Sequence, residues 1–342
     1  MNKFDVVIVG GGPGGLSCAA ALAGSGARVM LLESKQHLGR KVCAGGITWH
    51  GLIRNVPDRL IQRTFTEQHI FSNHQRITFR KPDPIIATVN REELGQWMLE
   101  EALNKGAQVR TGCRVTTISP RSLTAATRQG NTFTLLFDHL VGADGSTSLV
   151  RRHLGIPATR LGVGINYQVE GSYEHMEWHL NTALFGGGYG WIFPHRETVS
   201  IGAYAVRDAF NPDRLKQNLL RWASTRGFDL TPAPARAGCI NFDYRGYEFG
   251  NTWLVGDAAG LASGLTGEGI NPAIVSGEEV AGKIIDPSHQ TEPIARMVNK
   301  HRRHAGIVAL ASRSKPLCTI LMETLVVLLR LRLIDFQKEL SM

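Results

Sequence analysis

The residues best suited to bind a phosphate ligand lie near the start of the chain, where Gly10, Gly12 and Gly15 have the spacing G-x-G-x-x-G. Gly10 permits a tight turn, Gly12 lets a pyrophosphate approach the backbone, and Gly15 lets a helix pack closely on a strand. Pro13 and Gly14 open that helix, whose free N–H groups and positive dipole end would face the phosphates. The spacing therefore predicts a phosphate-binding turn.

The elements around this turn are those that a dinucleotide site requires. Residues 4–9 form a β-branched apolar run that predicts a buried parallel strand, and residues 16–23 predict a helix rich in small residues. A second strand is predicted over 28–32 and ends on Glu33, where an acid accepts hydrogen bonds from an adenosine ribose. Strand, glycines, helix, strand and acid follow in the order of a dinucleotide-binding unit.

Two aspartates, Asp144 and Asp257, each follow a short apolar strand, predicted over 137–141 and 253–255. Ligands of parallel sheets bind at the carboxyl ends of the strands, where an aspartate can orient ribitol hydroxyl groups. Glycines accompany the second aspartate and precede a helix predicted to extend to residue 283, so that a flat ring can approach the backbone there. The residues of this segment that are predicted to bind the ligand are Gly256, Gly267, Gly269 and Ile270.

These segments together span residues 4 to about 285 and resemble the FAD-dependent aromatic-hydroxylase-type flavoproteins, a fold shared by hydroxylases, halogenases and prenyl reductases. The resemblance implies FAD as the cofactor. In that family an arginine opens the helix after the first strands of the substrate domain, and Arg91 in Val89-Asn90-Arg91-Glu92 matches it. Its implied role is contact with the flavin. Arg40 lies where such flavoproteins often place an arginine near the cofactor phosphates.

Two further motifs narrow the resemblance. Cys43-Ala44-Gly45-Gly46 is similar to the Cys-x-Gly-Gly segment of geranylgeranyl reductase-like proteins. Tyr189-Gly190-Trp191-Ile192-Phe193-Pro194 matches the Tyr-x-Trp-x-Phe-Pro motif of the same group. Members of that group reduce isolated double bonds in isoprenoid chains. The resemblance therefore implies an FAD-dependent oxidoreductase acting on an isoprenoid or another apolar small molecule or lipid.

Reduction of an isolated alkene requires a hydride at one carbon and a proton at the other. Cys43 is the predicted proton donor, because its glycine-rich turn would bring it near the flavin ring; the alternative is a buried, inert thiol. Tyr189, Trp191 and Phe193 occupy alternate positions of one strand and so share one face. They are predicted to bind the apolar substrate, and the alternative is an ordinary sheet core.

Other functions remain open on the same fold. An FAD-dependent aromatic monooxygenase would react the reduced flavin with oxygen, and a redox sensor would bind FAD without turnover. A halogenase is disfavoured because its Trp-x-Trp-x-Ile segment is missing, and a flavin disulfide reductase because Thr48 stands where its second cysteine would be. Only one dinucleotide fingerprint is present. The electron donor, NAD(P)H or a redox protein, is therefore expected to bind transiently.

Composition limits the partners and the compartment. The formal net charge is +9, but the basic residues are spread along the chain and match no nucleic-acid-binding motif. An anionic membrane surface or a phosphorylated small molecule fits the charge better than a nucleic acid does. The five cysteines include no C-x-x-C pair and the histidines show no metal-ligand spacing, so we expect neither a disulfide framework nor a metal site. A reducing cytoplasm fits this usage.

The predicted fold is α/β, with a Rossmann-like FAD-binding domain interleaved with a smaller antiparallel-sheet substrate domain and followed by a helical tail. The predicted spans are 1–65, 88–155 and 250–290 for the FAD domain, 66–87 and 156–249 for the substrate domain, and 291–342 for the tail. In the tail, residues 317–334 are strongly apolar, but Glu323, Arg330 and Arg332 argue against a membrane span. Packing against the body or a second copy is favoured over peripheral contact with a membrane.

Overall fold

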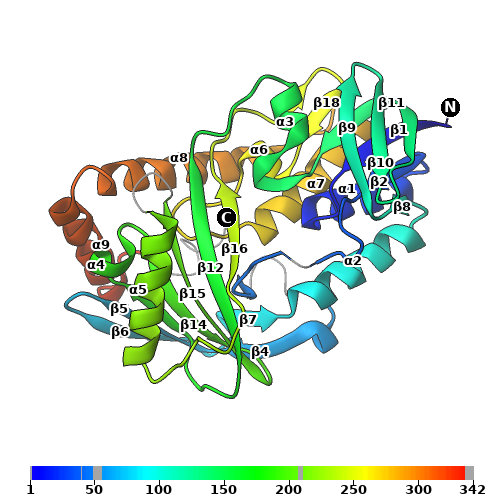
Figure 1. Cartoon of the computed structure of the whole chain (residues 1–342). Coiled ribbons are helices and arrows are strands. Elements are labelled where there is room, and N and C mark those ends of the chain that lie inside the picture. The colour runs from blue at the N-terminus through cyan, green and yellow to red at the C-terminus, as the bar shows by residue number, and fades with distance from the viewer. Residues whose placement is uncertain (1, 40, 49–55, 207–210, 336–342) are drawn as a thin grey trace.

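The chain folds around two large sheets that lie side by side (Figure 1). The computed structural model describes residues 2–39, 41–48, 56–206 and 211–335. The first sheet takes its strands from residues 2–32, 108–142 and 248–254, and the second takes its strands from 67–80, 161–206 and 236–241. Each sheet is therefore assembled from distant parts of the chain, and the chain passes between the two several times.

The first sheet is built on β1 (Asn2–Val9), whose second half is fully apolar and buried. β1 pairs in parallel with the next strand of the chain, because the covering helix between them returns the chain to the same end of the sheet, and on its other side it pairs in parallel with a strand ending at Gly142. In spatial order the strands are β17 (Glu248–Phe249), β18 (Thr252–Leu254), β11 (Thr132–Gly142), β1, β2 (Val29–Leu32) and β8 (Gln108–Arg110). β10 (Ser122–Thr127) pairs with β11, and β9 (Cys113–Ser119) pairs with β10, both antiparallel.

Three long helices pack together beside this sheet: α1 (Pro13–Gly24), α2 (Arg91–Asn104) and α7 (Ile270–Ile285). α1 and α7 approach closely because glycines face each other; a Cβ on Gly277 would lie 2.3 Å from the carbonyl oxygen of Gly14. Short helices follow the strand ends that face the second sheet, namely η3 (Gly145–Thr147), α3 (Leu149–His153) and α6 (Gly256–Ala259).

The second sheet is antiparallel except where β13 pairs with β5. In spatial order its strands are β16 (Arg236–Asn241), β12 (Leu161–Glu170), β15 (Thr198–Val206), β14 (Tyr189–Pro194), β13 (Glu177–Leu180), β5 (Glu67–Ser72) and β6 (Arg76–Arg80). Its side chains alternate between two cores. Ile192 and Ile201 pack under α5 (Pro212–Thr225) and α4 (Thr182–Phe185), whereas Trp191 and Tyr204 lie on the opposite face.

A small antiparallel sheet joins the two units. It consists of β3 (Gly46–Thr48), β7 (Ile86–Val89) and β4 (Ile61–Phe65), and the single turn η2 (Asp58–Leu60) precedes β4. The hydroxyl of Thr88 is buried and donates to the carbonyl of Pro194 at 2.9 Å, which fixes β7 against the end of β14. This sheet carries the chain from the Cys43 segment towards the second sheet.

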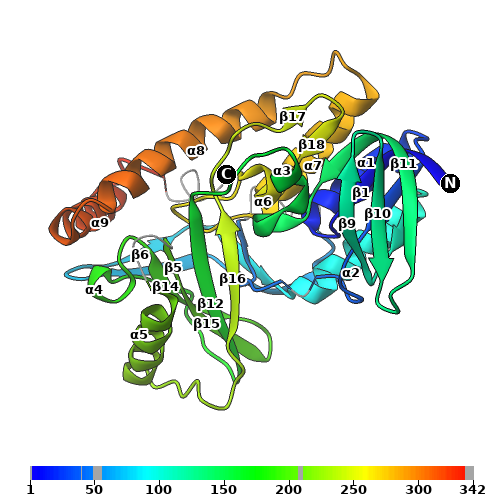
Figure 2. The ribbon, with the colours of Figure 1, turned by 45° about the horizontal axis from the view of Figure 1, so that its top comes forward.

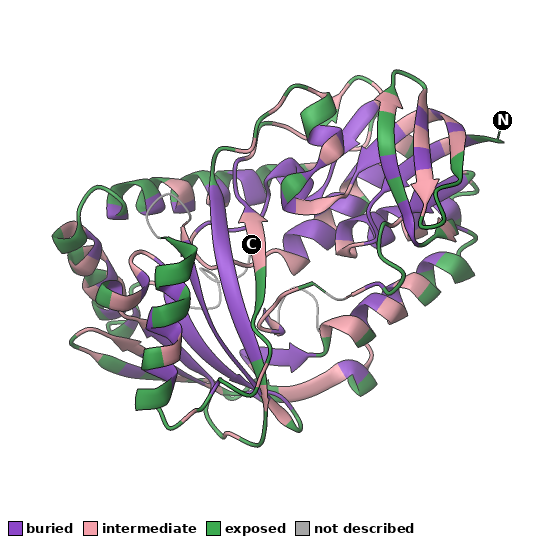
Figure 3. Ribbon diagram, in the orientation of Figure 1, coloured by how far each residue is buried: buried purple, intermediate pink, exposed green. Residues whose placement is uncertain are grey.

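The tail is helical as predicted for the residues that are described. α8 (Glu292–Ala311) runs from the first unit to the second, and α9 (Lys315–Arg330) packs back on β5 and α4 (Figure 2). Figure 3 shows the strands of both sheets largely buried and the outer faces of α5, α8 and α9 exposed. The predicted fold class is confirmed. The domain boundaries stay a prediction, and within the described ranges no helix has the length and apolarity to cross a membrane.

Candidate functional site

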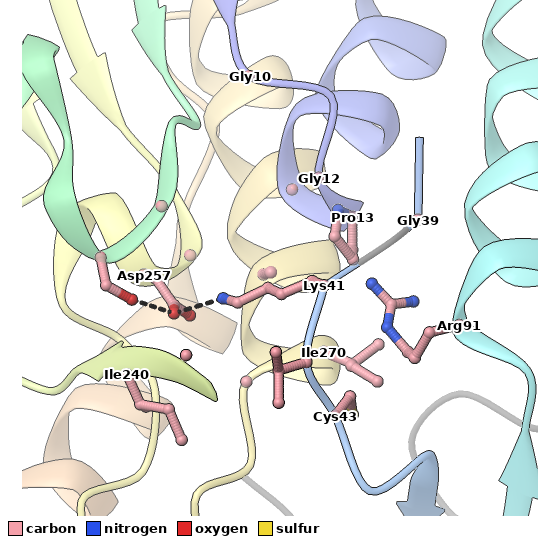
Figure 4. A pocket seen from close by; sticks show the side chains of 18 of the residues that line it. Gly10, Gly12, Pro13, Gly39, Lys41, Cys43, Arg91, Ile240, Asp257 and Ile270 are labelled. Atoms are coloured by element: carbon pink, nitrogen blue, oxygen red, sulfur yellow. Dashed lines mark hydrogen bonds and ion pairs between the residues drawn. The ribbon is translucent and has the colours of Figure 1, made fainter. Parts of the chain in front are cut away.

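A cavity of about 1380 Å³ lies between the two sheets, and its residues come from every segment that the sequence singled out (Figure 4). Its walls are the loops after β1, β2, β11 and β18, the start of α7 and the inner face of β14. Pockets for one small ligand typically measure about 300–1,000 Å³. The cavity can therefore hold a cofactor and a second ligand together.

The three fingerprint glycines have different surroundings. Gly10 has a φ of +110°, and a Cβ there would meet the carbonyl oxygen of Ala143 at 2.3 Å. A Cβ on Gly15 would lie 2.0 Å from the carbonyl oxygen of Gly10, whereas a Cβ on Gly12 would have nothing within 4 Å. Gly10 and Gly15 thus hold the turn and the helix together, and Gly12 opens the backbone to the cavity. Gly12 is also the N-cap of α1 and provides no side-chain cap, so the first N–H groups of α1 are available to an anion.

Glu33 braces this turn from the end of β2. Its Oε2 accepts from the backbone N–H of Gly11 at 2.7 Å, and its Oε1 accepts from the backbone N–H of Lys35 at 2.8 Å. A carboxylate offers about four acceptor positions, so these contacts leave room for ribose hydroxyls. Glu33 lines the cavity, and its contact with a ribose stays a prediction.

Asp257 joins three segments at the cavity floor. Its carboxylate is buried, and Oδ2 accepts from the Nζ of Lys41 at 2.7 Å and from the hydroxyl of Ser146 at 2.8 Å (Figure 4). Its backbone carbonyl accepts from Asn241 at 2.9 Å. The first two contacts link the segments after β2, β11 and β18 into one wall, and neither Lys41 nor Ser146 was identified from the sequence.

Asp144 lines the same cavity, but its carboxylate caps α3. Oδ1 accepts from the hydroxyl of Ser148 and Oδ2 from the backbone N–H of Leu149, both at 2.5 Å. Burial raises the pKa of this carboxyl group above its ordinary value, while these hydrogen bonds oppose the rise. The carboxylate thus has partners other than the predicted ribitol hydroxyls, and the ribitol contact stays a prediction.

Arg91 supplies a buried donor at the start of α2. Asn90 caps that helix by accepting from the backbone N–H of Glu92 at 2.9 Å. The guanidinium of Arg91 extends towards Pro13 and Lys41, and its Nη1 is buried with no hydrogen-bond partner among the described residues (Figure 4). Burial lowers its pKa.

A buried donor without an acceptor costs about 1–3 kcal/mol. An acceptor on a ligand in the cavity would remove that cost, and the phosphate or ring oxygens of FAD are such acceptors. Together with the open backbone at Gly12, this unsatisfied donor shows that the residues present fit FAD. Arg40, the other predicted arginine, lies outside the described residues.

Cys43 lies on the extended segment that leads into β3, and its Sγ accepts from the backbone N–H of Gly45 at 3.3 Å. His195 holds the same turn, with its Nε2 lying 3.1 Å from the carbonyl oxygen of Ala44. Because a carbonyl only accepts, that nitrogen carries the proton. Burial lowers the pKa of His195, so its ring is neutral. His195 is therefore a hydrogen-bonded structural residue that holds the turn next to Cys43.

The far wall of the cavity is aromatic. Tyr189, Trp191 and Phe193 project from one face of β14, as predicted, and Trp178 of β13 packs among them with ring centroids 4.8 Å from Tyr189 and 5.0 Å from Phe193. Tyr204 of β15 completes this wall. Trp178 and Tyr204 were missed because their strands carry no motif, although both are aromatic residues in β-rich stretches of the sequence.

Two hydroxyls of this wall fix the loop before α7. Tyr189 donates to the carbonyl of Thr266 at 2.5 Å, and Tyr204 donates to the carbonyl of Gly264 at 2.8 Å. Burial raises the pKa of both phenols, so both keep their protons. The loop leads to Gly267, with a φ of +68°, and to Gly269, the N-cap of α7, which provides no side-chain hydrogen bond. Its backbone thus faces the cavity.

The structure brings nearly all the predicted site residues to this one cavity. Gly15 lies behind the turn and contacts the backbone of Gly10 instead of the cavity. The predicted residues that line the cavity are Gly10, Gly12, Pro13, Gly14, Glu33, Cys43, Arg91, Asp144, Tyr189, Trp191, Phe193, Gly256, Asp257, Gly267, Gly269 and Ile270. No group of three or more His, Cys, Asp or Glu that could hold a metal occurs in the described part of the chain.

Comparisons with known proteins also point to an FAD-binding protein. The model of a family described as FAD binding domain matches residues 3–292. The chain is 27% identical to a geranylgeranyl diphosphate reductase of Rhodobacter capsulatus, over 82% of this chain and 74% of that protein. It is 28% identical to a digeranylgeranylglycerophospholipid reductase of Methanocaldococcus jannaschii, over 83% and 78%. The resemblance inferred from the sequence is confirmed.

A solved structure is similar over nearly the whole chain. It is a geranylgeranyl bacteriochlorophyll reductase-like protein of Thermoplasma acidophilum, with a TM-score of 0.79 and 19% identity. The match covers 92% of this chain and 89% of that one. At this identity the likeness shows the fold alone.

Proposed function

The chain belongs to the FAD binding domain family and is an FAD-dependent oxidoreductase, and from that premise we propose that it reduces isolated carbon–carbon double bonds of an isoprenoid or similarly apolar substrate. One observation carries the proposal. The glycine-rich cradle and the aromatic wall of β14 line the same cavity, so a flavin and an apolar chain can lie next to each other. The names of the relatives above support the same substrate class.

FAD, once reduced, supplies a hydride. The chain's part is to hold the cofactor and to place its ring. The backbone at Gly12 and the free N–H groups of α1 would bind the pyrophosphate, and Glu33 would accept from the adenosine ribose. Arg91 would donate from its unsatisfied Nη1. The loop at Gly267, fixed by the tyrosine hydroxyls, would place its backbone against the ring.

The aromatic wall favours an apolar substrate because it excludes water. The rings of Trp178, Trp191 and Phe193 offer a large apolar area with little conformational entropy to lose. Isoleucines from three other strands, Ile47, Ile86 and Ile240, line the same region. These side chains are apolar and exclude water from the surface that they form, so an isoprenoid chain fits it better than a polar substrate does.

We assign the proton donation to the Sγ–H of Cys43. The two tyrosine hydroxyls at the aromatic end of the cavity are already engaged. Tyr189 and Tyr204 donate to backbone carbonyls, and burial raises their pKa and keeps them protonated. The Nε2–H of His195 is likewise engaged with Ala44. Among the described residues, the sulfur of Cys43 accepts from Gly45, and because Cys43 lines the cavity its S–H would be free to face the substrate.

The electron donor is proposed to bind transiently. The single dinucleotide fingerprint is accounted for by FAD, so NAD(P)H or a redox protein would reach the oxidised flavin from outside and reduce it. The test of the function does not depend on which one it is, because dithionite can replace it.

The test is a multiple-turnover reaction under nitrogen, with the FAD-loaded protein, dithionite and a geranylgeranyl-bearing lipid. We expect the product mass to rise by two hydrogen atoms for each double bond reduced. An unchanged lipid under nitrogen, together with oxygen consumption that depends on an added aromatic compound in a separate aerobic assay, would replace the proposal with the monooxygenase. FAD that is bound in full and reduced by dithionite, with no change in the lipid and no oxygen consumption that depends on an aromatic compound, would favour the redox sensor.

A further inference from the structure

We propose that the outer face of the α8–α9 hairpin docks on an anionic membrane surface. The face consists of Ile307 and Leu310 on α8, and of Ile320, Val327 and Leu331 on α9. These side chains are exposed by 42%, 37%, 60%, 39% and 61%, and Leu333 just beyond them by 67%. Elsewhere in the described residues, only Leu103 and Ile285 are large apolar side chains of comparable exposure.

The apolar residues of α9 form a stripe that packing on the body does not use. Ile320, Val327 and Leu331 are spaced seven and four residues apart and so share one face of the helix. The opposite face, with Met322 and Val326 among its residues, is buried against the second sheet. α9 is therefore apolar on both its inner and its outer side, and a helix of that kind requires a cover on each.

The one acidic side chain of α9 is turned inward. Glu323 accepts from the hydroxyl of Ser72 at 2.9 Å and from the Nε2 of Gln75 at 2.7 Å, which fixes it to the turn between β5 and β6. The polar strip of the helix is thereby used for docking on the body. What remains outward is the apolar stripe, interrupted by the exposed Thr324, with basic residues at both ends.

The positive charge around the apolar face favours a membrane over a second copy of the chain as the surface that covers it. Residues 300–334 contain seven lysines and arginines and a single acidic residue, Glu323. Arg313 and Lys315 are exposed at the tip of the hairpin, and Arg330 and Arg332 at the end of α9. Two such faces would repel each other, whereas anionic lipid headgroups would attract them by roughly 1 kcal/mol per basic side chain near the surface. Apolar side chains flanked by basic ones are the pattern of a helix that lies in the bilayer interface.

The hairpin also contacts the loop of the cavity. On α8, His304 is buried and its Nδ1 lies 3.1 Å from the hydroxyl of Ser263, which in turn accepts from the backbone N–H of Thr266. Docking would therefore place the cavity close to the bilayer, where an apolar substrate resides. The proposal goes beyond the reductase function and does not require it, because vesicle binding is measured without substrate.

The test uses the full FAD-loaded chain and sedimentation with vesicles of phosphatidylcholine, alone or mixed with phosphatidylglycerol. We expect binding to the mixed vesicles that weakens with salt, and weaker binding to phosphatidylcholine alone. The triple variant I320S/V327S/L331S should bind the mixed vesicles at least about tenfold more weakly, since three apolar side chains no longer enter the interface. R313Q/K315Q should reduce the salt dependence, since it removes two of the four exposed basic side chains at the ends of the stripe.

Leu103→Ser is the matched control, because Leu103 is 47% exposed on α2, away from the hairpin. It should bind like the unaltered protein, and bound FAD and the far-ultraviolet circular dichroism confirm that each variant is folded. Triple-variant binding equal to that of the Leu103→Ser control would overturn the proposal. So would a dimer in light scattering that the triple variant abolishes while neither protein binds vesicles, since the cover would then be a second copy.

Discussion

At the scale of single residues, the glycines of the first loop differ in what a side chain at each position would meet. A side chain at Gly15 would collide with the backbone of Gly10, and this collision exists whether or not a ligand is bound. A side chain at Gly12 meets only the open cavity, so its cost arises when a pyrophosphate approaches. Stability and cofactor affinity can therefore be separated by two substitutions three residues apart.

Gly12→Ala should leave the melting temperature of the FAD-free protein close to that of the unaltered chain and weaken FAD binding at least about tenfold, by blocking close approach to the backbone. Gly15→Ala should lower the stability of the FAD-free protein itself by about 2 kcal/mol or more, because a Cβ 2.0 Å from a carbonyl oxygen forces the turn apart. Thermal denaturation and flavin fluorescence titration distinguish the two. Equal effects of both substitutions on stability would contradict the assignment.

Cys43 is assigned the proton, and its removal should affect turnover more than binding. Cys43→Ala should lower kcat by about 10²-fold or more, within the range for loss of a positioned proton donor, with FAD and substrate still bound. Cys43→Ser should recover part of the loss, because its hydroxyl can donate from nearly the same position. A purely structural thiol would instead give full activity in both variants, or loss of FAD in both. Single-turnover rates at several pH values measure the difference.

At the scale of elements, the site depends on how closely α7 is held to α1. Gly14 and Gly277 let the two backbones meet, and the hydroxyl of Ser276 on α7 accepts from the backbone N–H of Gly256 at 2.9 Å. This contact fixes the start of α6 and with it Asp257. The glycine turn of α1 and the glycine segment before α7 are thus parts of one rigid cradle.

Gly277→Ala should therefore destabilise the protein by about 2 kcal/mol or more and weaken FAD binding, because its Cβ would lie 2.3 Å from the carbonyl oxygen of Gly14. Gly306→Ala on α8 is the matched control, since a Cβ there meets nothing within 4 Å and alanine favours a helix by about 1 kcal/mol. It should stabilise the protein slightly. The opposite order of the two melting temperatures would show that the helix contact is not the constraint.

The sequence predicts those elements whose signals are local. β1, α1 and β2 follow one another within about thirty residues, so their turn residues and periodicity determine them together. The pairing of β1 with β11 joins segments about 130 residues apart, and nothing local to either one encodes that pairing. The predicted strand over 137–141 is accordingly only the second half of β11, the half that pairs with β1. β11 begins earlier, at Thr132, and its first half pairs with β10.

The same limit applies within the site. Its motif-bearing glycines and Cys43 were predicted, whereas Lys41 was missed because its partner, Asp257, lies 216 residues away. The roles of the aromatic residues were predicted only in part. The alternation of Tyr189 and Trp191 predicts a shared face, but the hydroxyl of Tyr189 fixes a loop that follows it by 77 residues. Such contacts depend on the tertiary arrangement of the sheets and not on spacing along the chain.

At the scale of the whole molecule, several buried histidines make the fold sensitive to acid. Burial lowers the pKa of His179, His195 and His301 below the ordinary value of 6.5. The unfolded chain therefore binds more protons than the folded chain at pH values below about 6.5. The stabilisation from keeping these rings neutral is complete above that pH and is lost as the pH falls.

The urea midpoint of the FAD-saturated protein should accordingly fall between pH 7 and pH 5, with each buried histidine contributing up to about 1.4 kcal/mol per pH unit. His301→Gln should make this dependence shallower, since a neutral amide replaces one titrating ring. A further loss is expected as the pH falls from about 4.5 to about 2. Hydrogen bonds from His179, Arg226 and Tyr173 lower the pKa of Glu177 to about 2, so in this range the unfolded chain binds a proton at Glu177 that the folded chain does not. A midpoint that is flat from pH 7 to pH 5 would be inconsistent with the buried rings staying neutral.

The central claim is that one cavity holds FAD beside an apolar alkene, and single-turnover spectroscopy without oxygen tests it most directly. The FAD-loaded protein is reduced with one equivalent of dithionite, a geranylgeranyl-bearing lipid is added, and the flavin absorbance is followed together with the mass of the lipid. The account predicts that the oxidised spectrum returns as the lipid gains two hydrogen atoms per flavin. A flavin that stays reduced in the presence of the lipid, and is reoxidised only when air is admitted, would contradict it.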